Sequence, residues 1–156
     1  MIGLALLATL TSAALAAEPA PAFAGEPQGF GLGVVFGAPS GISLIRRNDD
    51  RGAIQGSIGW NLVDDRLAVS ADYLLNVVIL DGPELPNVRF PLYVGIGGIA
   101  AVYDGFAYLG ARIPLGITVL PRKVRIDAFL EIVPVVDLIP ASGVSGEAGI
   151  GARYYF

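Results

Sequence analysis

The side chains that enzymes use most often are absent from this sequence. Its 156 residues include no histidine and no cysteine. This removes the usual general base, the Ser-His-Asp triad, imidazole metal ligands and all thiol or disulfide chemistry. We therefore predict that the protein is not an enzyme, and that it has no catalytic residue, no cofactor and no metal site.

Two acidic pairs and one glycine-rich run remain as motifs that could hold a ligand. Asp49-Asp50 and Asp64-Asp65 offer the oxygen ligands that calcium prefers. Each pair lies in a short predicted turn close to an arginine, which favours solvated turn residues instead. Gly95-Ile96-Gly97-Gly98 is weakly similar to a phosphate-binding loop, but no helix follows it, as such a loop requires. Neither motif predicts a binding site.

A set of charged residues is a stronger candidate for a functional site. The side chains along each predicted strand alternate between two faces, and these charges share a face with glycine and serine. We interpret them as one interior charge cluster. Its members are Asp72, Arg112, Asp127, Glu131, Glu147 and Arg153. An unpaired charge in a low-dielectric interior costs several kcal/mol, so we expect a salt-bridged plug. The alternative is a gated path for ions along the same residues.

Counting residues outward from the predicted turns suggests which charges meet. If the last two strands pair about a turn near residues 142–143, Glu131 lies opposite Arg153. The same count for the two preceding hairpins places Arg112 diagonal to Glu131 and Gly95 opposite Arg112. Diagonal neighbours are within reach of long side chains. We therefore expect Glu131 to be the hub between the two arginines.

The elements that must position these charges are eight runs that alternate at period two, which is typical of β-strands. The runs are about 30–37, 42–47, 53–61, 67–76, 90–102, 107–120, 124–138 and 147–156. In the clearest run Leu109, Ala111 and Ile113 lie on one face, while Gly110 and Arg112 lie on the other. The longest connection is expected between the fourth and fifth runs, at Val77 to Arg89.

The composition indicates where such strands belong. The chain is 54% apolar with 15% charged residues, and its mean hydropathy of +0.65 is too high for an ordinary soluble domain. Strands of about ten residues match the tilted span of a membrane, and glycine makes room inside a narrow barrel. We predict an all-β fold, namely a closed, antiparallel, up-and-down transmembrane β-barrel of eight strands. The net charge of −4 argues against nucleic acid as a partner.

The N-terminal segment reads as an export signal. Ile2 to Ala17 is an apolar run, and Ala14-Leu15-Ala16 and Ala22-Phe23-Ala24 have small residues at alternating positions, as at signal-peptidase sites. We predict a cleaved signal peptide at 1–24, with cleavage after Ala24 or near Ala17. A short linker would follow at 25–29, and the barrel would occupy 30–156.

The C-terminus carries a family resemblance. The chain ends in Phe156, with Tyr154 two residues earlier and Gly151 nearby, and this resembles the C-terminal assembly signal of bacterial outer-membrane barrels. Together with the stretches 110–116, 129–134, 137–140 and 149–156, it makes the chain similar to small eight-stranded barrels of the OmpA and OmpX type, and to a family of uncharacterised small bacterial barrels. The resemblance implies an outer-membrane location, recognition by the barrel-assembly machinery, and contact with outer-membrane lipid and lipopolysaccharide.

Aromatic residues on the apolar face are expected to mark the two membrane interfaces. They are Phe30, Phe36, Trp60, Tyr73, Tyr154 and Phe156. We expect a monomer with a structural or interaction role in the bacterial envelope. The alternatives are a narrow ion-conducting channel and a lipocalin-like periplasmic barrel that binds a small apolar ligand. A lipocalin needs an apolar interior, whereas the charges of this chain are predicted to point inward.

Overall fold

The protein is described by a computed structural model that covers residues 27–49, 51–61 and 65–156. The predicted signal peptide at 1–24 lies outside the described residues, as do residues 25 and 26 of the predicted linker. The described chain is all-β, and no helix in it is long and apolar enough to cross a membrane.

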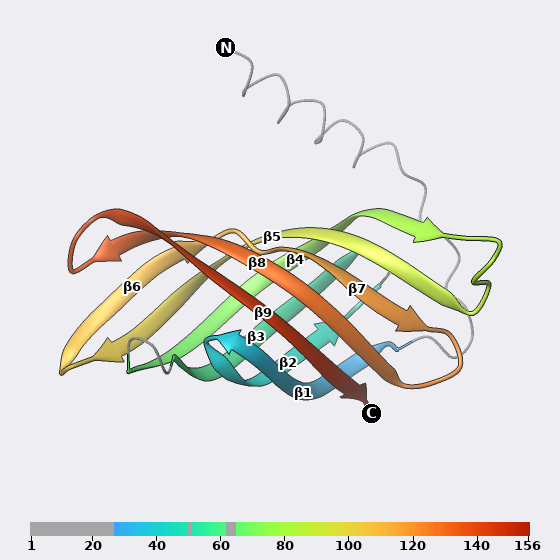
Figure 1. Cartoon of the computed structure of the whole chain (residues 1–156), viewed down its shortest axis with the longest axis horizontal. Coiled ribbons are helices and arrows are strands. Elements are labelled where there is room, and N and C mark those ends of the chain that lie inside the picture. The colour runs from blue at the N-terminus through green and yellow to red at the C-terminus, as the bar shows by residue number, and fades with distance from the viewer. Residues whose placement is uncertain (1–26, 50, 62–64) are drawn as a thin grey trace, which may run out of the picture.

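The strands form one antiparallel sheet that returns on itself as a ring (Figure 1). They are β1 Gly29–Ala38, β2 Ser40–Arg47, β3 Gly52–Asn61, β4 Arg66–Asp81, β5 Val88–Tyr103, β6 Phe106–Arg112, β7 Leu115–Pro121, β8 Ile126–Ile139 and β9 Gly143–Tyr155. The strands β1 to β5 pair in chain order, β8 pairs with β9, and β1 pairs with β9. That last pairing joins the first strand to the final one, so the sheet has no free long edge.

The described chain has nine strands, not the predicted eight, because the predicted strand at 107–120 is divided at Pro114. Proline has no N–H to donate to a ladder. The gap is bridged locally: Gly95 donates its N–H to the Pro114 carbonyl at 2.7 Å, and Ile113 donates to Pro134 at 3.0 Å. Both β6 and β7 pair with β5 on one side and β8 on the other. They therefore occupy a single position in the ring.

The predicted long connection from Val77 to Arg89 is also wrong. β4 continues to Asp81 and β5 begins at Val88, so only a short turn separates them. A β-bulge lies between Asn76 and Val78. A bulge adds one residue to one strand and shifts the alternation after it. That shift made the pattern appear to end at Asn76.

The ring has two ends. β1 begins and β9 finishes at one of them, which we call the terminus end, and the β4–β5 and β7–β8 hairpins turn there (Figure 1). The β5–β6 and β8–β9 hairpins turn at the opposite end, which we call the far end. The β5–β6 turn is Asp104-Gly105, and both residues have positive φ, 45° and 79°. Such two-residue turns match the twist of the flanking strands.

The two faces of the sheet have the reverse of the usual polarity. Large apolar side chains point outward along the strands, and Phe36 and Ile96 are 65% and 69% exposed. The inward side chains include arginines, aspartates and glutamates that are almost fully buried, of which Arg153 and Asp127 are examples. Successive Cβ atoms on a strand point to opposite faces. A single alternating sequence therefore produces both the apolar outside and the charged inside.

Candidate functional site: the charged interior

One group of interior residues surrounds an aspartate near the terminus end. We call Arg47, Asp127, Arg153 and Tyr155 the Asp127 cluster. Asp127 is fully buried and accepts hydrogen bonds from Arg153 Nε at 3.0 Å, from the Tyr155 hydroxyl at 2.6 Å and from Arg47 Nη2 at 3.4 Å. The Arg153 guanidinium lies 4.0 Å from the ring centre of Phe129. One anion is thus shared by two cations and a hydroxyl.

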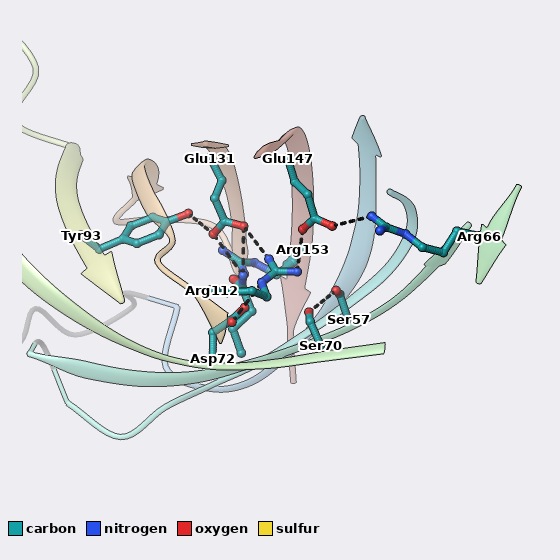
Figure 2. Close-up of polar contacts among 10 residues, drawn as sticks. Ser57, Arg66, Ser70, Asp72, Tyr93, Arg112, Glu131, Glu147 and Arg153 are labelled. Atoms are coloured by element: carbon teal, nitrogen blue, oxygen red, sulfur yellow. Dashed lines mark hydrogen bonds and ion pairs between the residues drawn. The ribbon is translucent and has the colours of Figure 1, made fainter. Parts of the chain in front are cut away.

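A second group surrounds an arginine nearer the far end. We call Asp72, Arg112, Glu131 and Glu147 the Arg112 cluster (Figure 2). The Arg112 guanidinium lies 2.9 Å from Glu147 Oε2, 3.2 Å from Asp72 Oδ1 and 3.8 Å from Glu131 Oε1. All four side chains are buried. One cation is thus shared by three anions.

Gln55 on β3 connects the two clusters. Its amide oxygen accepts from Arg153 Nη1 at 2.7 Å, and its amide nitrogen donates to Glu131 Oε2 at 3.1 Å. Glu131 also accepts from the Tyr93 hydroxyl at 2.8 Å. An amide has both donor and acceptor, so Gln55 can face an arginine and a carboxylate together. A charged residue in its place would repel one of them.

Gly97 gives the Arg112 cluster its room. It lies opposite Asp72 on β4 and opposite Arg112 on β6. A Cβ atom at Gly97 would overlap Asp72 Oδ1 and the carbonyl oxygen of Ala71. The absent side chain lets the aspartate and the arginine meet across the intervening strand.

The polar residues continue to the far end. Glu147 also pairs with Arg66 Nη2 at 3.4 Å (Figure 2). The Arg66 guanidinium lies 4.5 Å from the ring centre of Tyr108, whose hydroxyl donates to Asp137. Beside Arg112, a cavity of about 30 Å³ is lined in part by Gln55, Glu131 and Glu147. That volume is large enough for one or two water molecules.

The six residues predicted as one cluster are all buried inside the ring, but they divide between two clusters. Glu131 is not opposite Arg153: the β8–β9 register places Asp127 opposite Arg153 and Gly149 opposite Glu131. The true turn of this hairpin is earlier in the chain than residues 142–143, since β9 already begins at Gly143. The predicted hub is therefore wrong, and Arg153 pairs with Asp127.

The predicted register of the β5–β6 hairpin, which placed Gly95 opposite Arg112, is also wrong. Gly97, not Gly95, lies opposite Arg112, because the β5–β6 turn has only the two residues Asp104 and Gly105. The predicted partner was two residues away. A shift of two preserves the inward face, so the alternation could not reveal it.

Five interior residues were not predicted as cluster members. They are Arg47, Gln55, Arg66, Tyr93 and Tyr155. Gln55 and Tyr155 had the inward phase of their strands, so the alternation contained the signal. Arg47 stands at the end of β2 and shares the phase of the buried Ser43 and Ile45. The partners of these five residues lie on strands that are far away in the sequence, so the pattern of one strand could not identify them.

The six predicted interface aromatics are exposed on the outer face. Phe30, Tyr154 and Phe156 lie near the terminus end, where Phe156 N donates to Phe30 O at 3.0 Å and the Tyr154 and Phe156 rings meet edge-on at 5.5 Å. Tyr73 lies beside Gly52, where β3 begins. Phe36 and Trp60 lie towards the far ends of β1 and β3.

The third member of the predicted assembly signal, Gly151, points inward. A Cβ there would come within 2.5 Å of the Phe129 ring. No group of three or more potential ligands in the described part of the chain is arranged to hold a metal ion. The chain matches no protein-family model, no curated protein and no solved structure.

Proposed function

We propose that the chain is an integral β-barrel protein of the bacterial outer membrane, with a structural or interaction role and a filled interior. The observation that carries this proposal is the reversed polarity of the ring. Apolar side chains such as Phe36 and Ile96 are exposed, whereas the charges of the Asp127 and Arg112 clusters are buried.

The energetics of this arrangement favour a lipid environment. Exposed apolar surface costs about 25 cal/mol per Å² in water, and the outer face of this ring is apolar along every strand. In the hydrocarbon region each backbone N–H and C=O needs a partner within the protein. A sheet that returns on itself through the β1–β9 pairing meets that requirement without an exposed edge.

The location rests on the termini and on the aromatic residues. The resemblance of Gly151, Tyr154 and Phe156 to an assembly signal, with the export signal predicted from the sequence at 1–24, supports the outer membrane and the barrel-assembly machinery as a partner. The terminus end would face the periplasm, and the far end would face outside. Aromatic residues near both ends would lie at the lipid headgroups, in contact with lipid and lipopolysaccharide.

The interior supports a structural role over the two alternatives. Buried ion pairs and hydrogen bonds occupy the space between the strands, and the cavity beside Arg112 is only about 30 Å³. Even a narrow ion channel would need a continuous path that is wider than this cavity. A lipocalin-like carrier would need an apolar interior, whereas this one holds Asp127, Arg153 and Arg112. The sequence has no histidine and no cysteine, and we propose no enzymatic role.

Refolding into lipid vesicles tests the membrane location. The folded protein should remain with the vesicles after a carbonate wash and should migrate differently in a detergent gel before and after boiling. Recovery of a folded, soluble protein without detergent would contradict the proposal and favour the lipocalin-like alternative.

Planar-bilayer recording tests the filled interior. We expect no steady conductance at modest voltage. Steady, ion-selective currents would replace the structural role with the channel.

Trp60 reports on the outer face, because it is the single tryptophan and points away from the interior. Its fluorescence should be quenched by brominated lipid chains and protected from an aqueous quencher. The reverse result would mean that this face meets water.

A further inference from the structure

A notch interrupts the ring at the far end, between β6 and β8. The β6–β8 ladder ends at the pair Leu109 and Ile139. Beyond it, the β5–β6 hairpin continues to its turn, while the chain after β8 turns away at Pro140. A cavity of about 260 Å³ occupies the space between them. Its lining residues are Arg66, Tyr103, Phe106, Ala107, Tyr108 and Pro140.

Two aromatic side chains of the notch differ from the other exposed aromatics. Tyr103 and Phe106 are paired across the β5–β6 hairpin. By alternation from the buried Ala101 and from Tyr108, both have the inward phase. They are nevertheless 50% and 67% exposed, because the hairpin extends beyond the end of the ladder. They form an apolar wall on the inner side of the ring opening.

Arg66 supplies the charge of the notch. Its side chain is only 14% exposed, and its guanidinium lies over Tyr108 at 4.5 Å. In the described part of the chain it donates one hydrogen bond, to Glu147 at 3.4 Å, and Glu147 lies closer to Arg112, at 2.9 Å. A guanidinium has five N–H donors. The described lining residues of the notch include this one cation and no acid.

We propose that the notch binds the anionic headgroup of an amphiphile. The phosphate or carboxylate would accept hydrogen bonds from Arg66, as such groups do with guanidinium. The adjoining apolar part would pack on Tyr103 and Phe106. A volume of about 260 Å³ is slightly below the range of drug-sized ligand pockets, so the notch takes a headgroup and not a whole lipid.

This inference rests on the proposed membrane location, since the notch opens where lipid headgroups would lie. The test uses the folded protein in a non-ionic detergent and measures binding by native mass spectrometry. The probes are dihexanoyl phosphatidylglycerol, dihexanoyl phosphatidylcholine and inorganic phosphate. The first carries a net negative charge and an apolar part, the second is zwitterionic, and the third has no apolar part. We expect binding of the first to exceed binding of the other two by about tenfold or more, as expected for a lost charge-assisted contact.

Two substitutions examine the two halves of the notch. Arg66→Gln and Phe106→Ala should each weaken phosphatidylglycerol binding by about tenfold. Phe106 is mostly exposed, so its replacement should leave the fold intact even if Arg66→Gln disturbs Glu147. The matched control is Arg46→Gln, which removes an exposed arginine at the terminus end and should leave binding unchanged.

The proposal would be overturned if the wild type, Arg66→Gln and Phe106→Ala bound dihexanoyl phosphatidylglycerol with equal affinity. Equal binding of inorganic phosphate would also overturn it, because the aromatic wall would then contribute nothing. A result against the proposed membrane location would be separate from a result on the notch. It would show as a soluble protein in the vesicle experiment, whatever the notch binds in detergent.

Discussion

The two interior clusters have opposite compositions. The Asp127 cluster places two arginines around one aspartate, with contacts to the aspartate from 2.6 to 3.4 Å. The Arg112 cluster places three carboxylates around one arginine, with contacts from 2.9 to 3.8 Å and a cavity beside them. The first has an excess of positive charge and the second an excess of negative charge.

Neutrality is reached only when the two clusters are taken together with Arg66, the further partner of Glu147. The cations are Arg47, Arg66, Arg112 and Arg153, and the anions are Asp72, Asp127, Glu131 and Glu147, which makes four of each. Gln55 hydrogen-bonds to both clusters. These eight residues therefore form one charge-balanced network, and the effect of removing a charge depends on which cluster loses it. Urea unfolding of the refolded protein in lipid vesicles measures each effect below.

Arg112→Leu should have the largest effect. It leaves three buried carboxylates without their shared cation, so we expect a loss of at least ~3–5 kcal/mol, the range for breaking a buried pair. Buried carboxylates that face one another without a cation favour the uptake of a proton, and protonation removes their repulsion. The deficit relative to wild type should therefore shrink between pH 8 and pH 5. A variant that unfolds at the wild-type midpoint at pH 8 would disprove the shared role of Arg112.

Asp127→Asn should rank second. It retains the shape of the side chain but leaves Arg47 and Arg153 facing a neutral group, at a cost of about 3 kcal/mol. Arginine keeps its charge across the whole accessible pH range. In contrast to Arg112→Leu, acidification from pH 8 to pH 5 should therefore not rescue this variant. Rescue at pH 5 would mean that the two clusters do not differ in the sign of their excess charge.

Gly97→Ala tests the geometry of the Arg112 cluster without changing a charge. The added methyl group overlaps Asp72 and the neighbouring strand, so we expect a loss of about 1–3 kcal/mol from overpacking. The matched control is Gly98→Ala on the outer face, where the nearest atom is 3.7 Å away. Equal unfolding midpoints for the two variants would place Gly97 outside the cluster.

Glu131→Gln should have the smallest effect, about 1 kcal/mol or less, since an amide oxygen still accepts from Tyr93 and Gln55. Arg112 keeps Asp72 and Glu147 as closer partners, and one repulsive charge is removed. A loss as large as that of Asp127→Asn would restore Glu131 as the hub between the arginines.

The sequence alone determined which face most side chains of the predicted strands take. Because Cβ atoms alternate along a strand, the phase of Leu109, Ala111 and Ile113 predicted an apolar outside, and that of Arg112 predicted a charged inside. The all-β class and most of the strand positions followed from the same period. The interruption at Pro114 and the bulge near Val77 did not follow from this period. Both depend on how the backbone hydrogen bonds between neighbouring strands are completed.

Only the tertiary structure decided which charges meet. A register shift of two or four residues leaves every side chain on its own face, so period two cannot distinguish Asp127 from Glu131 as the residue opposite Arg153. Turn length sets the register within a hairpin, as it does at Asp104-Gly105. Gln55 on β3 and Arg47 on β2 reach partners on β8 and β9, which pair with neither β2 nor β3. Their contacts exist because closing the sheet brings inward side chains from distant strands into one narrow interior.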